Sequence, residues 1–190
     1  MPGTALFFRQ LLSRPLQISA IAPSSRGLAR AMAAGLGPQT GRVVEFGPGT
    51  GRLTEGILAA GVRPADLTLF EMNPEFASHL RARFPGVAVH HGGAETASDH
   101  VGVGVGAVIS GLPLLSMPVD VRLAIVRAAF AVLAPGGYYN QFTYGPRPAL
   151  SDAEIAGMGL QFRETARVLL NLPPARVHRF TRLGEGPRAG

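Results

Sequence analysis

A bend of alternating glycines follows a short apolar segment that contains one acid. Residues 43–51 read VVEFGPGTG, so Glu45 stands in the apolar run and Gly47, Gly49 and Gly51 follow it at every second position. Glycine allows a tight turn and brings the backbone against a ligand with no Cβ in the way. Because open α/β sheets bind ligands at the carboxyl ends of their strands, this spacing predicts a ligand site at the bend.

Two kinds of nucleotide ligand fit such a bend, and the spacing separates them. A dinucleotide site has the spacing G-x-G-x-x-G with a pyrophosphate at a helix N-terminus, whereas this chain has G-x-G-x-G. S-adenosylmethionine (SAM) has no phosphate but carries an ammonium group, which Glu45 could hold directly or through water. Glu71, at the end of a second apolar run, could accept hydrogen bonds from ribose hydroxyls. We therefore predict SAM as the cofactor; a nicotinamide site and a purely structural bend are the alternatives.

The elements that would position these residues alternate in type along the chain. Alternation of strand-like and helix-like segments predicts an α/β, Rossmann-like fold with a mostly parallel sheet flanked by helices. The last two strand-like segments predict a C-terminal antiparallel hairpin, which makes a seven-stranded sheet. The expected strands are residues 42–46, 67–71, 87–91, 106–110, 138–143, 165–170 and 177–182. The expected helices are residues 52–60, 74–84, 119–133 and 152–158, with a short one near residue 95 and a turn at 135–137.

The chain of 190 residues fits one main domain, which we expect at residues 41–190. Residues 1–40 are expected to add an amphipathic helix and a cap helix. On a helical wheel, Arg9 and Arg14 lie opposite an apolar half made of Ala5, Phe7, Phe8, Leu11, Leu12 and Leu16. This pattern is typical of an interfacial membrane helix, but an ordinary helix packed on the domain gives the same pattern.

Composition and charge exclude several classes of site. The chain has no cysteine, so it has neither disulfides nor a thiolate metal site, and we expect no metal. The net charge of +6 is concentrated at the ends, since residues 1–42 carry five arginines and no acid. Basic ends suit an anionic surface, either nucleic acid or lipid headgroups. The uncharged residues 101–119 contain several glycines and prolines, so we expect no membrane span, and we expect no export signal.

Several segments resemble a known enzyme family. Residues 45–51 (EFGPGTG) resemble motif I of class I methyltransferases, and residues 70–73 (FEMN) resemble their second motif. More narrowly, the chain resembles the small bacterial phospholipid N-methyltransferases, which convert phosphatidylethanolamine stepwise towards phosphatidylcholine. The narrower match covers most of the chain through IAPSSR (21–26), SGLPL (110–114), QFTYGP (141–146) and NLPPA (171–175).

The resemblance implies specific contacts with the methyl donor. Glu45, Gly47, Gly49 and Gly51 would contact SAM, Glu71 would bind the ribose and Met72 would pack on the adenine. After the third strand such enzymes often have Gly-Asp-Ala, whose acid binds the adenine amino group. This chain has GGA at residues 92–94, so that acid is missing. Backbone groups near Ala94 or the carboxylate of Glu95 are the expected substitutes.

The nearest competitors in fold are the adenine-N6 methyltransferases of ribosomal RNA. They carry Asn-Leu/Ile-Pro-aromatic after the fourth strand, whereas this chain has Gly111 and Leu114 at the Asn and aromatic positions. We therefore expect a phospholipid substrate and no nucleic acid partner; an enzyme like the adenine-N6 methyltransferases of ribosomal RNA, or another small-molecule N-methyltransferase, is the alternative. We expect a monomer in the cytoplasm, bound peripherally to the inner face of the cytoplasmic membrane.

The acceptor side is a hypothesis based on the fifth strand, which should bring Tyr144 to the same edge of the sheet as the methyl donor. The Ser110 carbonyl and the Tyr144 hydroxyl would orient the substrate amine, and Ser110 would also contact SAM. The expected substrate-binding residues are Ser25, Arg26, Gly111, Leu112 and Pro113. Ser25 would cap a helix that runs to about residue 36, while Arg26 would either bind the lipid phosphate or close over the donor.

Overall fold

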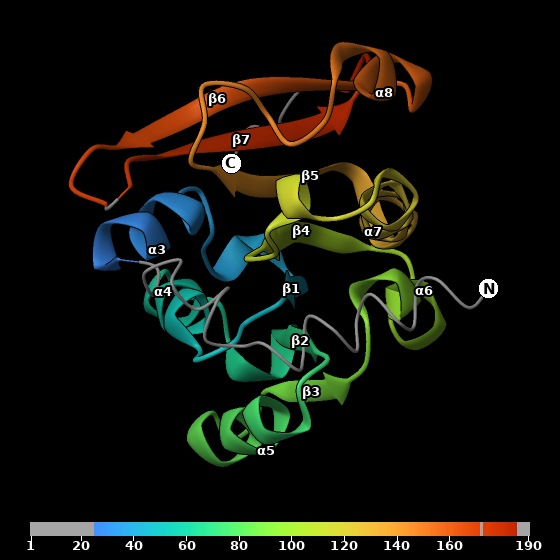
Figure 1. The fold of residues 1–190 in the computed structure, drawn as a ribbon. Helices are drawn as coiled ribbons and strands as arrows, with labels where there is room; N and C mark the ends of the chain where they lie inside the picture. The colour runs from blue at the N-terminus through green and yellow to red at the C-terminus, as the bar shows by residue number, and fades with distance from the viewer. Residues whose placement is uncertain (1–24, 172, 186–190) are drawn as a thin grey trace.

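The computed structural model describes residues 25–171 and 173–185, and its centre is one seven-stranded sheet (Figure 1). The strand order is β3-β2-β1-β4-β5-β7-β6. Six neighbouring pairs build it: the four from β3 to β5 are parallel, and the two that involve β7 are antiparallel. The strands are β1 (Val43–Phe46), β2 (Leu67–Glu71), β3 (Ala88–His91), β4 (Val105–Ser110), β5 (Leu133–Thr143), β6 (Leu160–Val168) and β7 (Ala175–Arg182). The predicted fold class is confirmed.

Helices cover both faces of this sheet, as Figure 1 shows for α3 and α4 on one side and α7 on the other. One buried cluster joins α3, α4 and α5 to the sheet, and a second joins α6, α7 and α8 to the other face. The helices are α3 (Arg26–Met32), α4 (Arg52–Ala59), α5 (Pro74–Arg83), α6 (Ala97–His100), α7 (Val119–Val132) and α8 (Asp152–Gly157). Short 3-10 turns are η1 (Pro38–Thr40), η2 (Pro64–Asp66), η3 (Ala94–Thr96) and η4 (Leu114–Ser116).

The strand register brings the predicted site residues to one edge of the sheet. Phe46 pairs with Phe70 on one side and with Ser110 on the other, and Ser110 pairs with Gln141. These strands are parallel, so the glycine bend and the loops after β2, β4 and β5 all leave the sheet at the same edge. We refer to it as the carboxyl edge.

Three predicted boundaries are wrong. The helix α3 ends at Met32 instead of near residue 36, because Gly35 turns the chain with a φ of 83°. Residues 135–137 lie inside β5 as an irregularity opposite Val105 and Ala107, not in a turn before it. The strand β6 begins at Leu160, five residues earlier than expected, because its exposed polar residues lie on a sheet edge and show no apolar alternation.

A membrane-spanning helix and a metal site can be assessed only for the described residues. Within residues 25–171 and 173–185, no helix is both long and apolar enough to cross a bilayer. The same residues hold no cluster of three or more potential metal ligands. The predicted amphipathic helix at residues 5–16 lies outside the described residues.

Candidate functional site

The glycine bend connects β1 to α4 with three residues in the left-handed region. The φ values are 66° at Gly47, 55° at Gly49 and 82° at Gly51, which other residues rarely adopt. A Cβ on Gly49 would face open space, whereas one on Gly47 would collide with the Leu112 side chain and one on Gly51 would lie 2.6 Å from the Phe84 ring. Of these three glycines, only Gly49 therefore has open space beside it that a ligand could fill. At the other two glycines the missing Cβ makes room for the protein's own side chains.

Glu45 is a fully buried carboxyl group beneath the bend. Its Oε2 accepts a hydrogen bond of 2.7 Å from Thr54 Oγ1 in α4, while its Oε1 is buried without a hydrogen-bond partner in the described part of the chain. Burial raises the pKa of Glu45 to about 8, and the nearby Glu71 charge adds to the rise. A buried acceptor without a partner fits a ligand that brings a cationic donor group.

Glu71 lies at the end of β2 and binds the glycine bend. Its Oε2 accepts from the Gly49 N–H at 3.0 Å, and its Oε1 accepts from the Asn73 N–H at 2.8 Å. Burial raises the pKa of Glu71 although both hydrogen bonds oppose the rise. Each carboxylate oxygen keeps a second lone pair, so both can still accept from sugar hydroxyls. Met72 follows at the same edge and packs against the buried cluster on the α7 face.

At position 93, where the methyltransferases that the sequence resembles often have an acid, another carboxylate fills the space. A Cβ on Gly93 would collide with both carboxylate oxygens of Glu95, so the Glu95 side chain folds back over Gly93. Its Oε2 is buried and has no hydrogen-bond partner among residues 25–171 and 173–185. Ala94 between them is buried in the core. The carboxylate of Glu95 is therefore available at the place where an aspartate at position 93 would begin.

The loop after β4 is held by a buried polar network. Ser110 is fully buried, and its Oγ accepts from the Leu112 N–H at 3.4 Å. Gln141 donates from Nε2 to the Leu112 carbonyl at 2.9 Å and accepts from the Tyr139 hydroxyl at 2.7 Å. Gln141 thus fixes the loop that contains Gly111, Leu112 and Pro113. This role of Gln141 is not evident from the sequence, although Gln141 opens one of the segments that carry the resemblance.

Tyr144 follows β5 at the carboxyl edge and is half-buried on the α3 face. Its ring packs edge-on against Phe142 at 5.3 Å between centroids, and burial raises the pKa of its hydroxyl. Ser110 lies at the same edge, but its side chain faces the α7 side of the sheet. No hydrogen bond joins Ser110 and Tyr144 in the part of the chain described, so their side chains do not form a pair.

Ser25 begins α3 and ties it to the turn of the C-terminal hairpin. The Ser25 hydroxyl accepts from the Leu28 N–H at 3.1 Å, which confirms it as the N-cap. The Ser25 N–H donates to Oδ1 of Asn171 at 3.2 Å, and Asn171 is buried. The Asn171 side chain thus joins the segments 21–26 and 171–175, which are far apart in the sequence and both contribute to the resemblance. The sequence alone does not indicate that Asn171 joins these segments.

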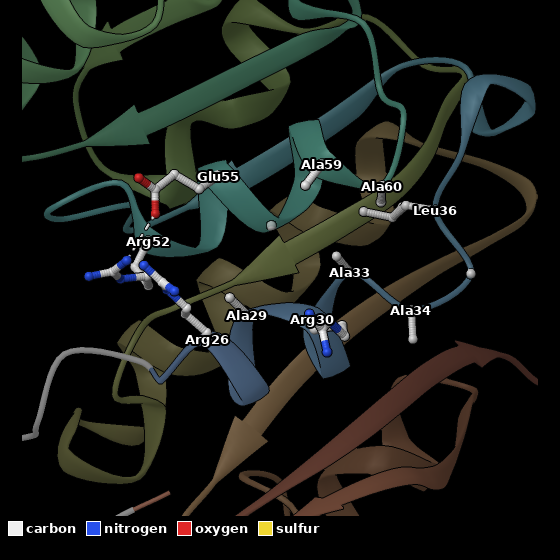
Figure 2. A pocket seen from close by; sticks show the side chains of 12 residues that line it. Arg26, Ala29, Arg30, Ala33, Ala34, Leu36, Arg52, Glu55, Ala59 and Ala60 are labelled. Atoms are coloured by element: carbon white, nitrogen blue, oxygen red, sulfur yellow. Dashed lines mark hydrogen bonds and ion pairs between the residues drawn. The ribbon is translucent and has the colours of Figure 1, made fainter.

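Arg26 lines a groove of about 600 Å³ between α3 and α4 (Figure 2). The groove begins at Arg52, directly after the glycine bend, and runs along both helices. Its floor consists of small residues because the helices approach closely, so that a Cβ on Gly56 would lie 2.9 Å from the Ala29 carbonyl oxygen. Arg52 pairs with Glu55 at 3.2 Å, while Arg26 and Arg30 have no ion pair with any described residue. The groove combines an apolar floor with a basic end at the carboxyl edge.

A curated relative has a similar sequence. The ornithine lipid N-methyltransferase of Singulisphaera acidiphila is 33% identical over 158 residues, which are 74% of this chain and 78% of that enzyme. The chain belongs to the same family of methyltransferases. No known family profile matches the chain.

Several solved structures with a similar fold are also methyltransferases. Mitomycin 7-O-methyltransferase has a TM-score of 0.66 at 21% identity over 92% of this chain and 60% of its own. A TehB-like SAM-dependent methyltransferase from Corynebacterium glutamicum has a TM-score of 0.64 at 16% identity over 96% and 100%. The 1,6-didemethyltoxoflavin-N1-methyltransferase of Burkholderia thailandensis, solved with S-adenosylhomocysteine, has a TM-score of 0.66 at 15% identity over 95% and 88%. The predicted cofactor, SAM, is confirmed.

Proposed function

We propose that this methyltransferase transfers methyl groups from SAM to the amino group of phosphatidylethanolamine and its mono- and dimethyl derivatives at a membrane surface. The observation that carries a lipid substrate is the similarity to a lipid N-methyltransferase across about three quarters of both chains. The basic, apolar groove beside the glycine bend supports it. Ornithine lipid, the substrate in the relative's name, is the second candidate.

Glu45, Gly49 and Glu71 form the cradle for the methyl donor in this proposal. The free Oε1 of Glu45 would accept from the ammonium group of SAM, directly or through water. The open space at Gly49 lets the nucleoside lie against the bend, and Glu71 would accept from the ribose. Gly47 and Gly51 would contribute backbone only.

Met72, Ala94 and Glu95 would hold the adenine. Met72 would pack on the ring, and the Glu95 carboxylate would accept from the exocyclic amino group in place of the missing aspartate. When bound, SAM supplies an electrophilic methyl group that transfers in line to the amine nitrogen, as the sulfonium becomes a thioether.

The acceptor amine must be neutral to attack, and an exposed alkylamine is mostly protonated at pH 7. Desolvation at the carboxyl edge would lower its pKa. In this proposal the Ser110 carbonyl and the Tyr144 hydroxyl orient the amine, and the loop of Gly111, Leu112 and Pro113 excludes water. Gln141 positions that loop through its hydrogen bond to the Leu112 carbonyl. The Tyr144 ring would also attract the quaternary product.

Arg26 would bind the lipid phosphate at the basic end of the groove, where a guanidinium can make two parallel hydrogen bonds. Its neighbour Arg30 adds positive charge there. Residues 1–40 would form the membrane-contacting and cap region in front of the methyltransferase domain at 41–190. Anionic lipids would attract the arginines of that region.

The test is a vesicle assay with products measured by mass spectrometry. Vesicles of phosphatidylethanolamine, vesicles with ornithine lipid and ribosomal RNA are offered in parallel with SAM. We expect mono-, di- and trimethylated phosphatidylethanolamine; methylation of ornithine lipid alone would change the assigned headgroup, and methylation of RNA alone would overturn the lipid assignment. Arg26→Ala should slow lipid methylation about tenfold with unchanged SAM affinity, while Arg127→Ala, exposed on α7, should have no effect.

A further inference from the structure

The turn between β6 and β7 exposes two leucines. Leu169 is 74% exposed and Leu170 is 99% exposed, the highest values among the large apolar side chains in the described residues. Single exposed apolar residues are common on protein surfaces, but two adjacent leucines at a hairpin tip form a protruding apolar contact. We call these two residues the leucine tip.

The leucine tip is held in place by the residue that follows it. Asn171 is buried, donates from Nδ2 to the Pro173 carbonyl at 2.8 Å and accepts from the Ser25 N–H at 3.2 Å. One hydrogen bond thereby holds the turn internally, and the other holds it against the start of α3. A turn anchored by a buried side chain presents its leucines in a defined position instead of folding them onto the protein.

The leucine tip lies at the carboxyl edge of the sheet. Thr143, the last residue of β5, pairs with Arg176 near the start of β7, so the β6–β7 turn extends beyond the same edge as Tyr144. Figure 1 shows this turn beside α3, with the opposite end of the hairpin near α8. Leu115, which follows β4 at the carboxyl edge, is also 56% exposed.

Arginines stand directly behind the leucine tip. Arg167 and Arg176 face each other across the β6–β7 pair, and both contact Glu164, so one net positive charge remains in this group. Arg26 adds another at the start of α3. Leucines in front of guanidinium groups match a bilayer, where apolar side chains enter the acyl boundary and arginines meet phosphates.

We propose that the leucine tip is a membrane contact that inserts into the bilayer interface and holds the carboxyl edge against the lipid headgroups. This inference rests on the proposed lipid substrate and adds a contact separate from residues 1–24. A second copy of the chain fits the tip less well, because two side chains bury far less than the roughly 1,000 Å² that a stable interface needs.

The experiment compares three full-length proteins on vesicles of phosphatidylethanolamine and anionic phosphatidylglycerol. They are the unmodified protein, the double variant Leu169→Ser/Leu170→Ser and the matched control Leu183→Ser. Leu183 is 69% exposed at the other end of the hairpin, away from the carboxyl edge. We expect the vesicle affinity of the double variant, measured by co-sedimentation, to fall about tenfold or more, because each leucine side chain gains free energy when it leaves water. The control should bind vesicles normally.

Activity measurements separate this inference from the proposed function. The double variant should methylate a water-dispersed, short-chain phosphatidylethanolamine at the normal rate but lose activity on vesicles. Equal vesicle binding by all three proteins would overturn the membrane contact while leaving the substrate assignment intact. A change in sedimentation from dimer to monomer in the double variant, with unchanged vesicle binding, would also overturn it in favour of a second copy. Absence of methylation of any lipid by the unmodified protein would instead reject the proposed function.

Discussion

The Gly49 N–H donates a hydrogen bond of 3.0 Å to Oε2 of Glu71, so the glycine bend after β1 is tied to the end of β2. The carboxylate that is proposed to bind the ribose therefore also holds the backbone on which the nucleoside would rest. The other oxygen of Glu71 accepts from the N–H of Asn73, the N-cap residue of α5. One side chain thus couples the shape of the bend to the sugar position.

Replacing Glu71 should weaken donor binding through both effects. We expect Glu71→Ala to raise the dissociation constant for SAM about tenfold or more in calorimetry, because it removes the ribose acceptor and frees the bend. Glu71→Gln keeps one oxygen and should lose less. The control is Glu75→Ala, an exposed acid in the first turn of α5. Equal SAM affinity in the Glu71 and Glu75 variants would contradict the assignment.

Substitutions at Gly49 and Gly51 should separate ligand binding from folding. Both positions have positive φ, which costs an alanine about 1 kcal/mol. Gly49→Ala faces open space and should lose donor affinity with a melting temperature only a few degrees lower. Gly51→Ala also meets the Phe84 ring at 2.6 Å and should melt several degrees below Gly49→Ala. Equal melting temperatures would show that the ring yields at no cost.

Local pattern predicts the elements of this fold well where an apolar run has clear ends. The strand β2 has the expected bounds, Leu67–Glu71, because its apolar run ends in an acid and is followed by the helix-starting Asn73-Pro74. The glycine bend was placed correctly for the same reason. These features depend on neighbours in sequence, so the sequence alone contains the information.

The parts that could not be predicted depend on contacts across the sequence. Only the fold shows that Leu112 and Phe84 fill the spaces beside Gly47 and Gly51. A polar residue such as Asn171 normally indicates an exposed turn, and its burial becomes evident only when Ser25 lies against it. A sequence pattern therefore locates the site, while tertiary packing decides which of its residues face a ligand.

Because Glu45 is buried, we expect the free energy of unfolding to fall as pH rises. Its pKa is raised from 4.5 to about 8 in the folded protein, so the folded state holds a proton that the unfolded state has released. The stabilisation is fully present below about pH 4.5 and is lost as pH rises through about 8. We expect the free energy of unfolding without donor to fall by up to about 1.4 kcal/mol per pH unit in this window. Chemical denaturation at several pH values measures it, and Glu45→Gln should flatten the slope.

Donor binding should show the opposite dependence on pH. The ammonium group of SAM favours the ionised form of Glu45, so binding releases a proton and the affinity rises with pH up to about 8. Calorimetry in two buffers of different ionisation enthalpy measures the proton directly. Glu45→Gln should bind more weakly and release none. Proton release that persists in Glu45→Gln would assign the titration to another group, such as Glu71.

Glu95 should determine the preference for adenine. Its carboxylate folds over Gly93, so it can accept from an exocyclic amino group but would repel a carbonyl oxygen at that place. We expect the unmodified protein to bind S-adenosylhomocysteine more tightly than its inosine analogue. Glu95→Ala should reduce this preference about tenfold, whereas Asp99→Ala, an exposed acid in α6, should leave it unchanged.

A second substitution tests whether Glu95 replaces the aspartate that the family often has after the third strand. In the unmodified protein, a side chain at position 93 would collide with the Glu95 carboxylate, so Gly93→Asp alone should weaken donor binding. In the Glu95→Ala background that space is free, and Gly93→Asp should restore the preference for adenine over its inosine analogue. Failure of this double variant to recover the preference, with a normal melting temperature, would mean that the two carboxylates do not serve the same contact. Recovery would show that a carboxylate from position 95 and one from position 93 can make the same contact with the adenine.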